Sequence, residues 1–253
     1  MNFEKSYTVI FAFFVVHWYL SVFAQSFFLH RYMAHAMFKM NRFWERFFYF
    51  ATFLFQGSSF LHPKAYAQLH AEHHKHSDTE QDPHSPHFFK DVVSMMVSTC
   101  RVYLDFRLGK RVSTSKYINS LPTWRTIDTL GNSLLVRFLF CAIYTLIYVI
   151  FAPSAWLYLL LPIHFLMGPI HGAFVNWCGH KYGYRNHPTE DHSKNTFAWD
   201  LLFAGETFQN NHHRYPNRVN FATKWFEWDI LYPVIWCMDR LAIIQINRPQ
   251  LRS

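Results

Sequence analysis

The chain has 253 residues, of which 51% are hydrophobic and only 16% are charged. This apolar content excludes intrinsic disorder, and the scarcity of glycine and cysteine excludes a collagen-like chain or a disulfide scaffold. The formal net charge of +8 favours anionic partners, such as phosphorylated ligands, lipid headgroups or an acidic protein.

The first predicted element is a membrane-spanning helix over residues 7–29. This segment carries no formal charge and is long enough to cross a bilayer, which takes about 20 residues. A cleaved signal peptide is the alternative, but the N-terminal flank has one Lys preceded by a Glu, and no A-x-A-like cleavage site is present. We therefore expect a retained transmembrane helix.

The second predicted element is a short apolar helix over residues 47–61. Its 15 residues are few for a full crossing of the hydrocarbon core. The segment therefore suits a helix that lies in the membrane interface or dips partway into the bilayer.

A helical hairpin is predicted further along the chain. Residues 138–179 contain no Lys, Arg, Asp or Glu, which leaves room for two spans. An Ala-Pro-Ser tripeptide interrupts this run as a tight turn would, so we expect helices over 132–151 and 155–176. Pro162 and Pro169 should bend the second helix of the hairpin.

The remaining stretches, 62–131 and 177–253, are polar, and no linker separates them. We expect a single domain over residues 1–253: an all-α integral membrane protein with three transmembrane helices, or four if 47–61 crosses, and a helical cap. Of the 24 Lys and Arg residues, 21 lie in the two polar stretches and in residues 30–42. The positive-inside rule then places the cap on the cytoplasmic side of a bacterial inner membrane or the endoplasmic reticulum.

Four histidine motifs lie in this predicted cap. They are H-x-x-x-x-H, H-x-x-H-H, N-x-x-x-H and Q-N-N-H-H, and they contain His30, His35, His70, His73, His74, His180, His212 and His213. Positions i, i+3 and i+4 share one face of a helix, so their imidazoles can converge, whereas His30 and His35 are five apart and need a break or a metal between turns. Imidazole binds Zn, Cu, Fe and Ni, and a structural zinc needs only four ligands. The eight clustered histidines therefore predict two metal ions.

The other histidines are expected to have different roles. We expect ordinary interior or surface residues at His17, His62, His164, His171, His187 and His192. His76, His84 and His87 lie near the second motif and are expected to support ligands or to lie at the surface. No H-E-x-x-H motif is present, which disfavours a zinc metalloprotease.

Taken in order, the four motifs resemble those of the membrane-bound fatty acyl desaturase family, and most closely its stearoyl-CoA desaturase-like branch. The resemblance runs from about Phe13 to Lys224. It includes Ser77-Asp78, Asp82-Pro83-His84 and the H-H-R-Y-P run that begins at His212. The resemblance implies a non-haem di-iron enzyme. It would use O2 and two electrons to remove two hydrogens from an acyl chain and leave a cis double bond, by default at the ninth carbon.

The resemblance also implies roles for individual residues. The eight clustered histidines match the iron ligands of the family, and Asn176 matches an asparagine that reaches one iron through water. Gln209 stands where the third motif of the family usually begins with His. Its amide can ligate iron, hold a ligand water or orient a neighbouring histidine, and we favour a water-mediated or orienting contact.

The first two motifs must meet at one metal site, so they must lie on the same side of the membrane. A full crossing by 47–61 would separate His30 from His70 by about 30 Å, so this helix should not cross. The family usually has two spans before the first motif, whereas here only 29 residues precede His30, enough for one. Three crossings then place the N-terminus outside.

A role in chain-length selection is predicted for the first span. Phe14 and Trp18 share the face of His30, and they would close an acyl tunnel that ran along it. Ordinary helix packing is the alternative for both residues.

Partners and alternative functions follow from the same features. No haem-binding or Gly-rich nucleotide motif is present, so electrons must come from a separate ferredoxin or cytochrome b5-type protein. The acyl substrate is linked to CoA, acyl-carrier protein or a membrane lipid, and no nucleic acid partner is expected. A lipid or carotenoid hydroxylase on the same scaffold is the nearest alternative, and the N-x-x-x-H pair favours desaturation. A metal transporter is disfavoured because the predicted spans contain no Asp or Glu.

Overall fold

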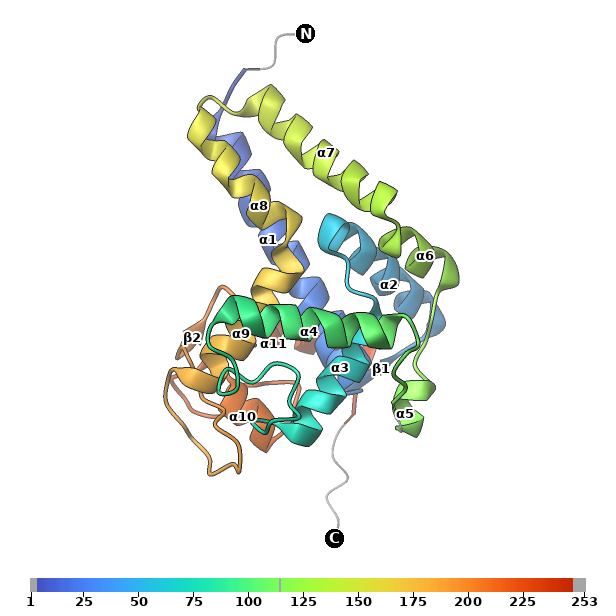
Figure 1. Cartoon of the computed structure of the whole chain (residues 1–253), viewed down its shortest axis with the longest axis vertical. Coiled ribbons are helices and arrows are strands. Elements are labelled where there is room, and N and C mark those ends of the chain that lie inside the picture. Colours follow the sequence, from blue (N-terminus) through green and yellow to red (C-terminus); the bar gives the residue numbers. More distant parts are fainter. Residues whose placement is uncertain (1–3, 114, 248–253) are drawn as a thin grey trace.

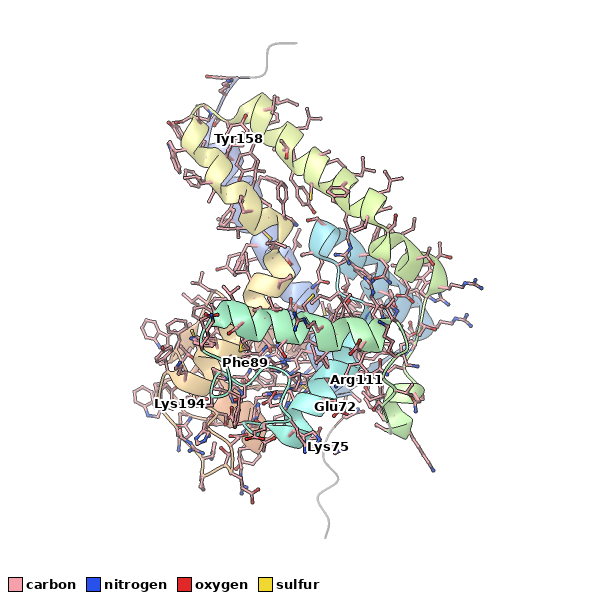
Figure 2. The ribbon with its side chains drawn as sticks, in the orientation of Figure 1. Glu72, Lys75, Phe89, Arg111, Tyr158 and Lys194 are labelled. Atoms are coloured by element: carbon pink, nitrogen blue, oxygen red, sulfur yellow. The ribbon has the colours of Figure 1, made fainter. Side chains whose placement is uncertain are left out.

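Long apolar helices form one half of the molecule, and shorter helices and loops form a cap below them (Figure 1). The computed structural model describes residues 4–113 and 115–247, so the ends of the predicted 1–253 domain lie outside the described residues. The labelled side chains of Glu72, Lys75, Arg111 and Lys194 lie in the cap half, whereas Tyr158 lies at the far end of the apolar half (Figure 2).

The elements follow one another along the chain with short connections. The helices are α1 (Tyr7–Phe23), η1 (Ala24–Ala34), α2 (Arg42–Gln56), η2 (Gly57–Ser59), α3 (Pro63–His76), α4 (Val92–Arg107), α5 (Lys116–Asn119), α6 (Arg125–Asn132), α7 (Leu134–Phe151), η3 (Ala155–Leu160), α8 (Leu161–Phe165), α9 (Met167–Lys181), α10 (Gln209–Arg214) and α11 (Tyr232–Arg240). The strands are β1 (Phe38–Met40), β2 (Trp199–Asp200), β3 (Trp228–Asp229) and β4 (Ile244–Ile246).

Among the described residues, two helices are long and apolar enough to cross a membrane, and a bent pair would make a third if it forms one span. α1 and η1 form one 28-residue helix, Tyr7–Ala34, and α7 covers 18 residues. The third segment joins Ala155–Phe165 to Met167–Lys181 across a bend of 73°. The two helices match the first two predicted spans, with the first longer than expected, and the bent pair lies where the third span was predicted.

The bend between α8 and α9 has a local cause. Pro169 has no N–H to donate to the carbonyl of Phe165, four residues earlier. That carbonyl instead accepts a hydrogen bond from the Ser58 hydroxyl at 3.1 Å. The predicted bend is therefore confirmed at Pro169, whereas Pro162 lies in the first turn of α8, where proline is tolerated.

α2 is amphipathic and short. Its Asn41 N-cap accepts a hydrogen bond from the amide of Trp44 at 3.0 Å, and the helix ends at Gly57, whose φ is +48°. One face packs into the core with Phe48 and Phe53. The opposite face exposes Phe43, Phe47, Phe50 and Leu54 at helical spacing. The length of α2, about 22 Å, is less than the thickness of the hydrocarbon core. α2 therefore has the form expected of a helix in the interface, as predicted for 47–61.

η1 is a π-helix that carries the first histidine motif. In a π-helix each amide bonds to the carbonyl five residues earlier, and the His35 amide bonds to the His30 carbonyl at 3.1 Å. This geometry brings residues five apart close together. The break expected between His30 and His35 is thus replaced by a wider helical turn, and their ring centroids lie 4.9 Å apart.

Two small strand pairs depart from the expected all-α fold. β1 pairs with β4 in antiparallel register, with Phe38 opposite Ile246. β2 pairs with β3 in parallel register, with Trp199 opposite Trp228. Each pair joins chain segments that are far apart in the sequence, which local hydrophobic patterns do not reveal.

A buried ion pair fixes η1 to the C-terminal part of the cap. The Arg31 guanidinium lies 2.7 Å from the Asp229 carboxylate, and both side chains are fully buried. The same guanidinium lies 4.0 Å from the ring centroid of Phe221 and donates to Ser26. Gly205, with φ +87°, leaves room for Asp229, because a Cβ there would lie 2.5 Å from its carboxylate. The first histidine motif therefore depends on this pair for its position.

Replacing Arg31 tests this dependence. Arg31→Met leaves the Asp229 carboxylate buried without its cation, so the free energy of unfolding should fall by about 3–5 kcal/mol. The matched control is Arg111→Met, because Arg111 pairs with Asp105 on the exposed surface at 3.4 Å and should contribute less than about 1 kcal/mol. Unfolding by denaturant in detergent micelles measures both variants. Equal stability of the two variants would contradict the assigned role of Arg31.

Candidate metal centre

All eight predicted ligand histidines come together in the cap, in two adjacent groups. The first group is His30, His35, His70, His74 and His212, and the second is His73, His180 and His213. Within each group the candidate ligand atoms all lie within 4.8 Å of one another. The eight histidines of the four motifs therefore lie together, and their role as metal ligands stays a prediction.

Four elements deliver these side chains. η1 carries the first motif, and α3 presents the second motif on one face. α3 begins at Pro63, and the His62 side chain caps it by accepting from the amide of Ala65. α10 carries His212 and His213, and the C-terminal end of α9 carries His180.

The nitrogen atoms are close enough to share a cation. Nε2 of His35 lies 2.7 Å from Nε2 of His70, and Nε2 of His74 lies 3.0 Å from Nε2 of His212. A metal–nitrogen bond of about 2.1 Å brings ligand atoms to within about 3–4 Å of each other. Nε2 of His180, in the second group, is buried and has no hydrogen-bond partner among the described residues. The short distances between nitrogens in both groups, together with this unpaired nitrogen, fit a pair of metal ions.

Burial favours the neutral imidazoles that a metal requires. It lowers the pKa of His35, His70, His74 and His212 well below 6.5, and the charges of neighbouring histidines lower it further. Burial also lowers the pKa of His213, although its hydrogen bond to Asp191 acts in the opposite direction. At neutral pH these imidazoles therefore have a free lone pair for ligation.

Four carboxylates orient the histidines from behind. The Nδ1 atoms of His73, His180 and His213 pair with Asp82, Asp78 and Asp191 at 2.9, 2.8 and 2.5 Å. In the first group, His30 is the one member with such a partner among the described residues, Glu206 at 2.5 Å. A carboxylate on Nδ1 fixes the ring and leaves Nε2 free for a metal. The second group, with a carboxylate behind every ring, is therefore the more strongly oriented of the two.

These carboxylates were only partly foreseen from the sequence. Asp78 and Asp82 belong to the runs of residues that resemble the family, but no sequence motif contains Asp191 or Glu206. Burial alone would raise the pKa of Asp78 and Asp191, but hydrogen bonds from His180 and His213 lower it below its usual range. Both groups are therefore anionic at neutral pH.

His84 lies closer to the centre than predicted. It is buried, its ring centroid lies 4.3 Å from that of His73, and it forms a third possible metal-binding group with His73 and Asp82. Neither ring nitrogen of His84 has a hydrogen-bond partner among the described residues. Burial lowers the pKa of His84 to about 4, so the ring is neutral.

Asn176 and Gln209 lie beside the two groups. Both side chains line the adjoining cavity, and Gln209 packs against Gly179, where a Cβ would lie 2.4 Å from its Cγ. The Gln209 amide nitrogen donates to the backbone carbonyl of Glu206 at 2.7 Å. This bond fixes the Gln209 side chain to the backbone of Glu206, whose carboxylate pairs with His30.

Three of the histidines expected to be ordinary have notable surroundings. Nδ1 of His17 lies 2.7 Å from Nδ1 of His164. The other ring nitrogen of His164, Nε2, lies 2.9 Å from the Tyr148 hydroxyl. His171 is buried without a hydrogen-bond partner among the described residues, and it lines the cavity. The hydrogen bonding expected of an ordinary interior histidine is therefore met at His164 but not at His171.

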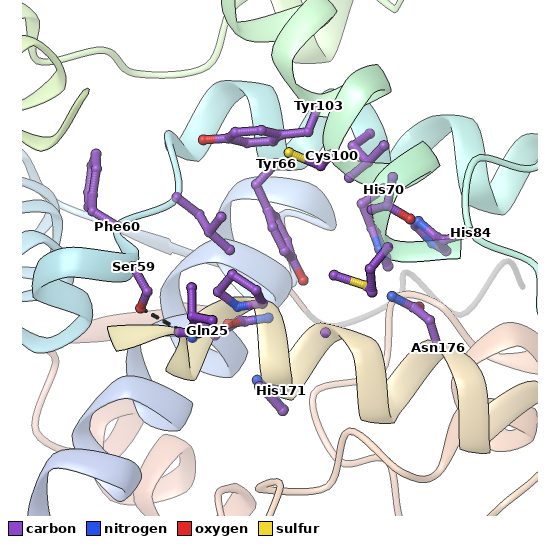
Figure 3. A pocket seen from close by; sticks show the side chains of 18 of the residues that line it. Gln25, Ser59, Phe60, Tyr66, His70, His84, Cys100, Tyr103, His171 and Asn176 are labelled. Carbon is purple, nitrogen blue, oxygen red and sulfur yellow. Dashed lines mark hydrogen bonds between the residues drawn. The ribbon is translucent and has the colours of Figure 1, made fainter. Parts of the chain in front are cut away.

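A cavity of about 640 Å³ opens beside the histidine cluster. Its walls include Leu61, Leu69, Met96, Leu104 and Val175, and its inner end reaches His30 and His70. Figure 3 shows Cys100 and Tyr103 on one wall, with His171 and Asn176 on the opposite wall along α9. The size and apolar walls suit a hydrocarbon chain.

The predicted tunnel residues do not line this cavity. Trp18 donates its indole N–H to the Leu202 carbonyl at 2.9 Å and packs edge-on against Phe203. Phe14 packs edge-on against His164 within the apolar half. The cavity extends between α3, α4 and α9 and not along this face of α1, so the structure favours ordinary packing for both residues.

Comparisons with known proteins agree with this geometry. The Fatty acid desaturase family matches residues 6–236. An sn-1 stearoyl-lipid 9-desaturase of Synechocystis sp. is 26% identical over 85% of this chain and 64% of its own length. A Delta-9 desaturase-like 5 protein of Arabidopsis thaliana is 28% identical over 85% of this chain and 68% of its own length. An acyl-CoA C20 Delta5-desaturase of Anemone leveillei is 27% identical over 94% of this chain and 72% of its own length.

The carboxylates behind the second group give a test of metal binding. Asp191→Asn removes the anion that orients His213, so metal affinity should fall by about 10–100-fold. Glu190→Gln is the matched control, because Glu190 is exposed and adjacent in the sequence. Iron retained by each purified variant against increasing chelator measures the effect. Equal retention by the two variants would rule out an orienting role for Asp191.

Gln209 gives a second test. If the site holds two irons and Gln209 only positions its neighbours, Gln209→Ala should keep both irons and lose only part of the activity, because no ligand is removed. His212→Ala should lose iron and all activity. Elemental analysis of iron per chain distinguishes the two outcomes. Loss of one iron per chain in Gln209→Ala would make Gln209 itself a ligand.

Proposed function

This chain belongs to the fatty acid desaturase family, and from that premise we propose that it is a membrane-bound fatty acyl desaturase with a di-iron centre. The chain spans 64–72% of the length of the three relatives described above. Two of those relatives are named as desaturases of lipid-linked or CoA-linked acyl chains. The proposed substrate class is therefore a fatty acyl chain.

One observation carries the proposal. The two histidine groups adjoin the inner end of an apolar cavity. His30 and His70 belong to the first group and also line the wall of this cavity. A hydrocarbon chain in this cavity would thus lie against the metal ligands. An arrangement of this kind supports oxidation of the chain itself over chemistry on a polar headgroup.

The chain would supply ligands, orientation and exclusion of water. The eight histidines would hold two irons, with Asn176 and Gln209 beside them. When bound, the irons would supply the activation of O2 that, with two electrons and two protons, removes two hydrogens from the chain and yields an alkene and two waters. The four carboxylates fix the imidazole rings, and the apolar walls keep water away from the reacting carbons.

The position of the double bond and the partners are part of the same proposal. The ninth carbon is the default position, in keeping with the names of two relatives. The electrons would come from a separate ferredoxin or cytochrome b5-type protein that docks on the basic cap, which would face the cytoplasm. Lys75 and Lys194 lie on this cap.

Lipid analysis of an expressing host tests the proposal. Gas chromatography–mass spectrometry should detect a new cis-monounsaturated fatty acid, with its double bond located by derivatisation. His213→Ala should abolish the product while the protein still accumulates in the membrane, because it removes a ligand without emptying the core. A hydroxylated product would indicate a hydroxylase on the same scaffold. An unchanged lipid profile with active electron donors present would contradict the proposal.

A further inference from the structure

The outer end of the cavity is lined by cations. Arg107, at the C-terminal end of α4, and Arg137, in the first turns of α7, both belong to its wall. Asn132, at the end of α6, lies between these helices, and its side-chain oxygen accepts a long hydrogen bond of 3.4 Å from the Arg107 guanidinium. The cavity therefore runs from the histidines at one end to two guanidinium groups at the other.

Neither guanidinium is neutralised by the protein. Arg137 donates to the backbone carbonyls of Ser58 and Phe60 at 2.8 and 2.6 Å, which fixes the side chain but leaves its charge uncompensated. Arg107 has only the long contact to Asn132. In the part of the chain that the structure describes, no carboxylate lies within 4.0 Å of either group. Two partly buried positive charges at one mouth favour an anionic ligand.

A second cavity of about 590 Å³ adjoins this mouth and shares Asn132 with it. Its wall includes His62, Arg125 and Asp128. The Asp128 carboxylate already accepts hydrogen bonds from the Tyr49 hydroxyl and from a backbone amide. The residues that line the second cavity all have polar side chains, in contrast to the apolar walls of the first, and the cavity offers space for a headgroup beside the two arginines.

We propose that Arg107 and Arg137 bind the phosphate of a glycerophospholipid whose acyl chain occupies the apolar cavity. This inference rests on the proposed function and specifies its substrate as an acyl chain linked to a membrane phospholipid. Arginine forms paired hydrogen bonds with phosphate oxygens, and Arg107 has the unpaired donors to do so.

The location of the mouth favours a membrane lipid over a soluble acyl carrier. Arg137 lies in the first turns of α7, which has the composition of a membrane span. Around it, Leu134, Leu135 and Phe138 expose 70%, 79% and 69% of their surface. Such apolar exposure beside a cation is typical of the boundary between hydrocarbon and headgroups. Figure 1 shows the start of α7 and the C-terminal end of α4 on the same side of the molecule. A lipid could therefore reach this mouth from within the bilayer.

Binding of defined acyl ligands to the iron-loaded full chain tests the proposal. Competition with a tritiated lipid in mixed micelles would compare stearoyl phosphatidylglycerol, stearoyl diacylglycerol and stearoyl-CoA. Arg107→Gln should weaken phosphatidylglycerol binding about tenfold and leave diacylglycerol binding unchanged, because only the former has a phosphate. Arg107→Lys keeps the charge but loses the paired hydrogen bonds, so its affinity should lie between those of the wild type and Arg107→Gln. Arg101→Gln is the matched control, since Arg101 is an exposed residue on the same helix outside the cavity wall.

Three outcomes would overturn the proposal. Wild-type affinity of Arg107→Gln for phosphatidylglycerol would exclude the arginine contact. Equal losses for phosphatidylglycerol and diacylglycerol would indicate a purely structural role, and thermal unfolding of the variant would check this. A loss for stearoyl-CoA alone would identify a soluble carrier. If the wild-type chain produces an alkene in any of these cases, only this inference fails, whereas the absence of an alkene refutes the proposed function.

Discussion

Eight imidazoles from four separate segments have to meet as neutral groups inside one protein, and the cap is organised around this requirement. Burial lowers the pKa of most of these rings and so favours their neutral form, but buried nitrogens without a partner are costly unless another group binds them. The π-helical turn of η1 brings His30 and His35 onto one site, and α3 supplies three histidines from a single face. A pair of metal ions would satisfy the nitrogens that the protein itself leaves unpaired.

The surrounding charges divide into two layers with different tasks. Behind the rings, carboxylates fix their orientation, with three in the second group and one in the first. Farther out, the buried Arg31–Asp229 pair joins η1 to the C-terminal segment, so the first motif is fixed by residues almost 200 positions away. Loss of such a pair is costly because the remaining charge stays buried. The metal site and the stability of the cap are therefore linked.

The sequence predicted the features that follow from local patterns. Long charge-free runs identified the spans, helical spacing identified the histidine groups, and Pro169 identified the bend. Features that depend on tertiary contacts were missed. Asp191 lies 22 residues from His213 in a loop without a motif, and only folding brings them together. Phe14 and Trp18 share a helical face with His30, but a shared face does not determine what packs against it, and Trp18 meets Phe203 in place of a tunnel.

The central claim is that the two histidine groups hold two irons at the inner end of an acyl cavity. Anomalous diffraction from crystals of the purified protein at the iron absorption edge tests it most directly. The account predicts two iron peaks per chain, one within the group that contains His30, His35, His70, His74 and His212, and one within the group that contains His73, His180 and His213. A single peak, or a peak among His73, Asp82 and His84 with the first group empty, would contradict it.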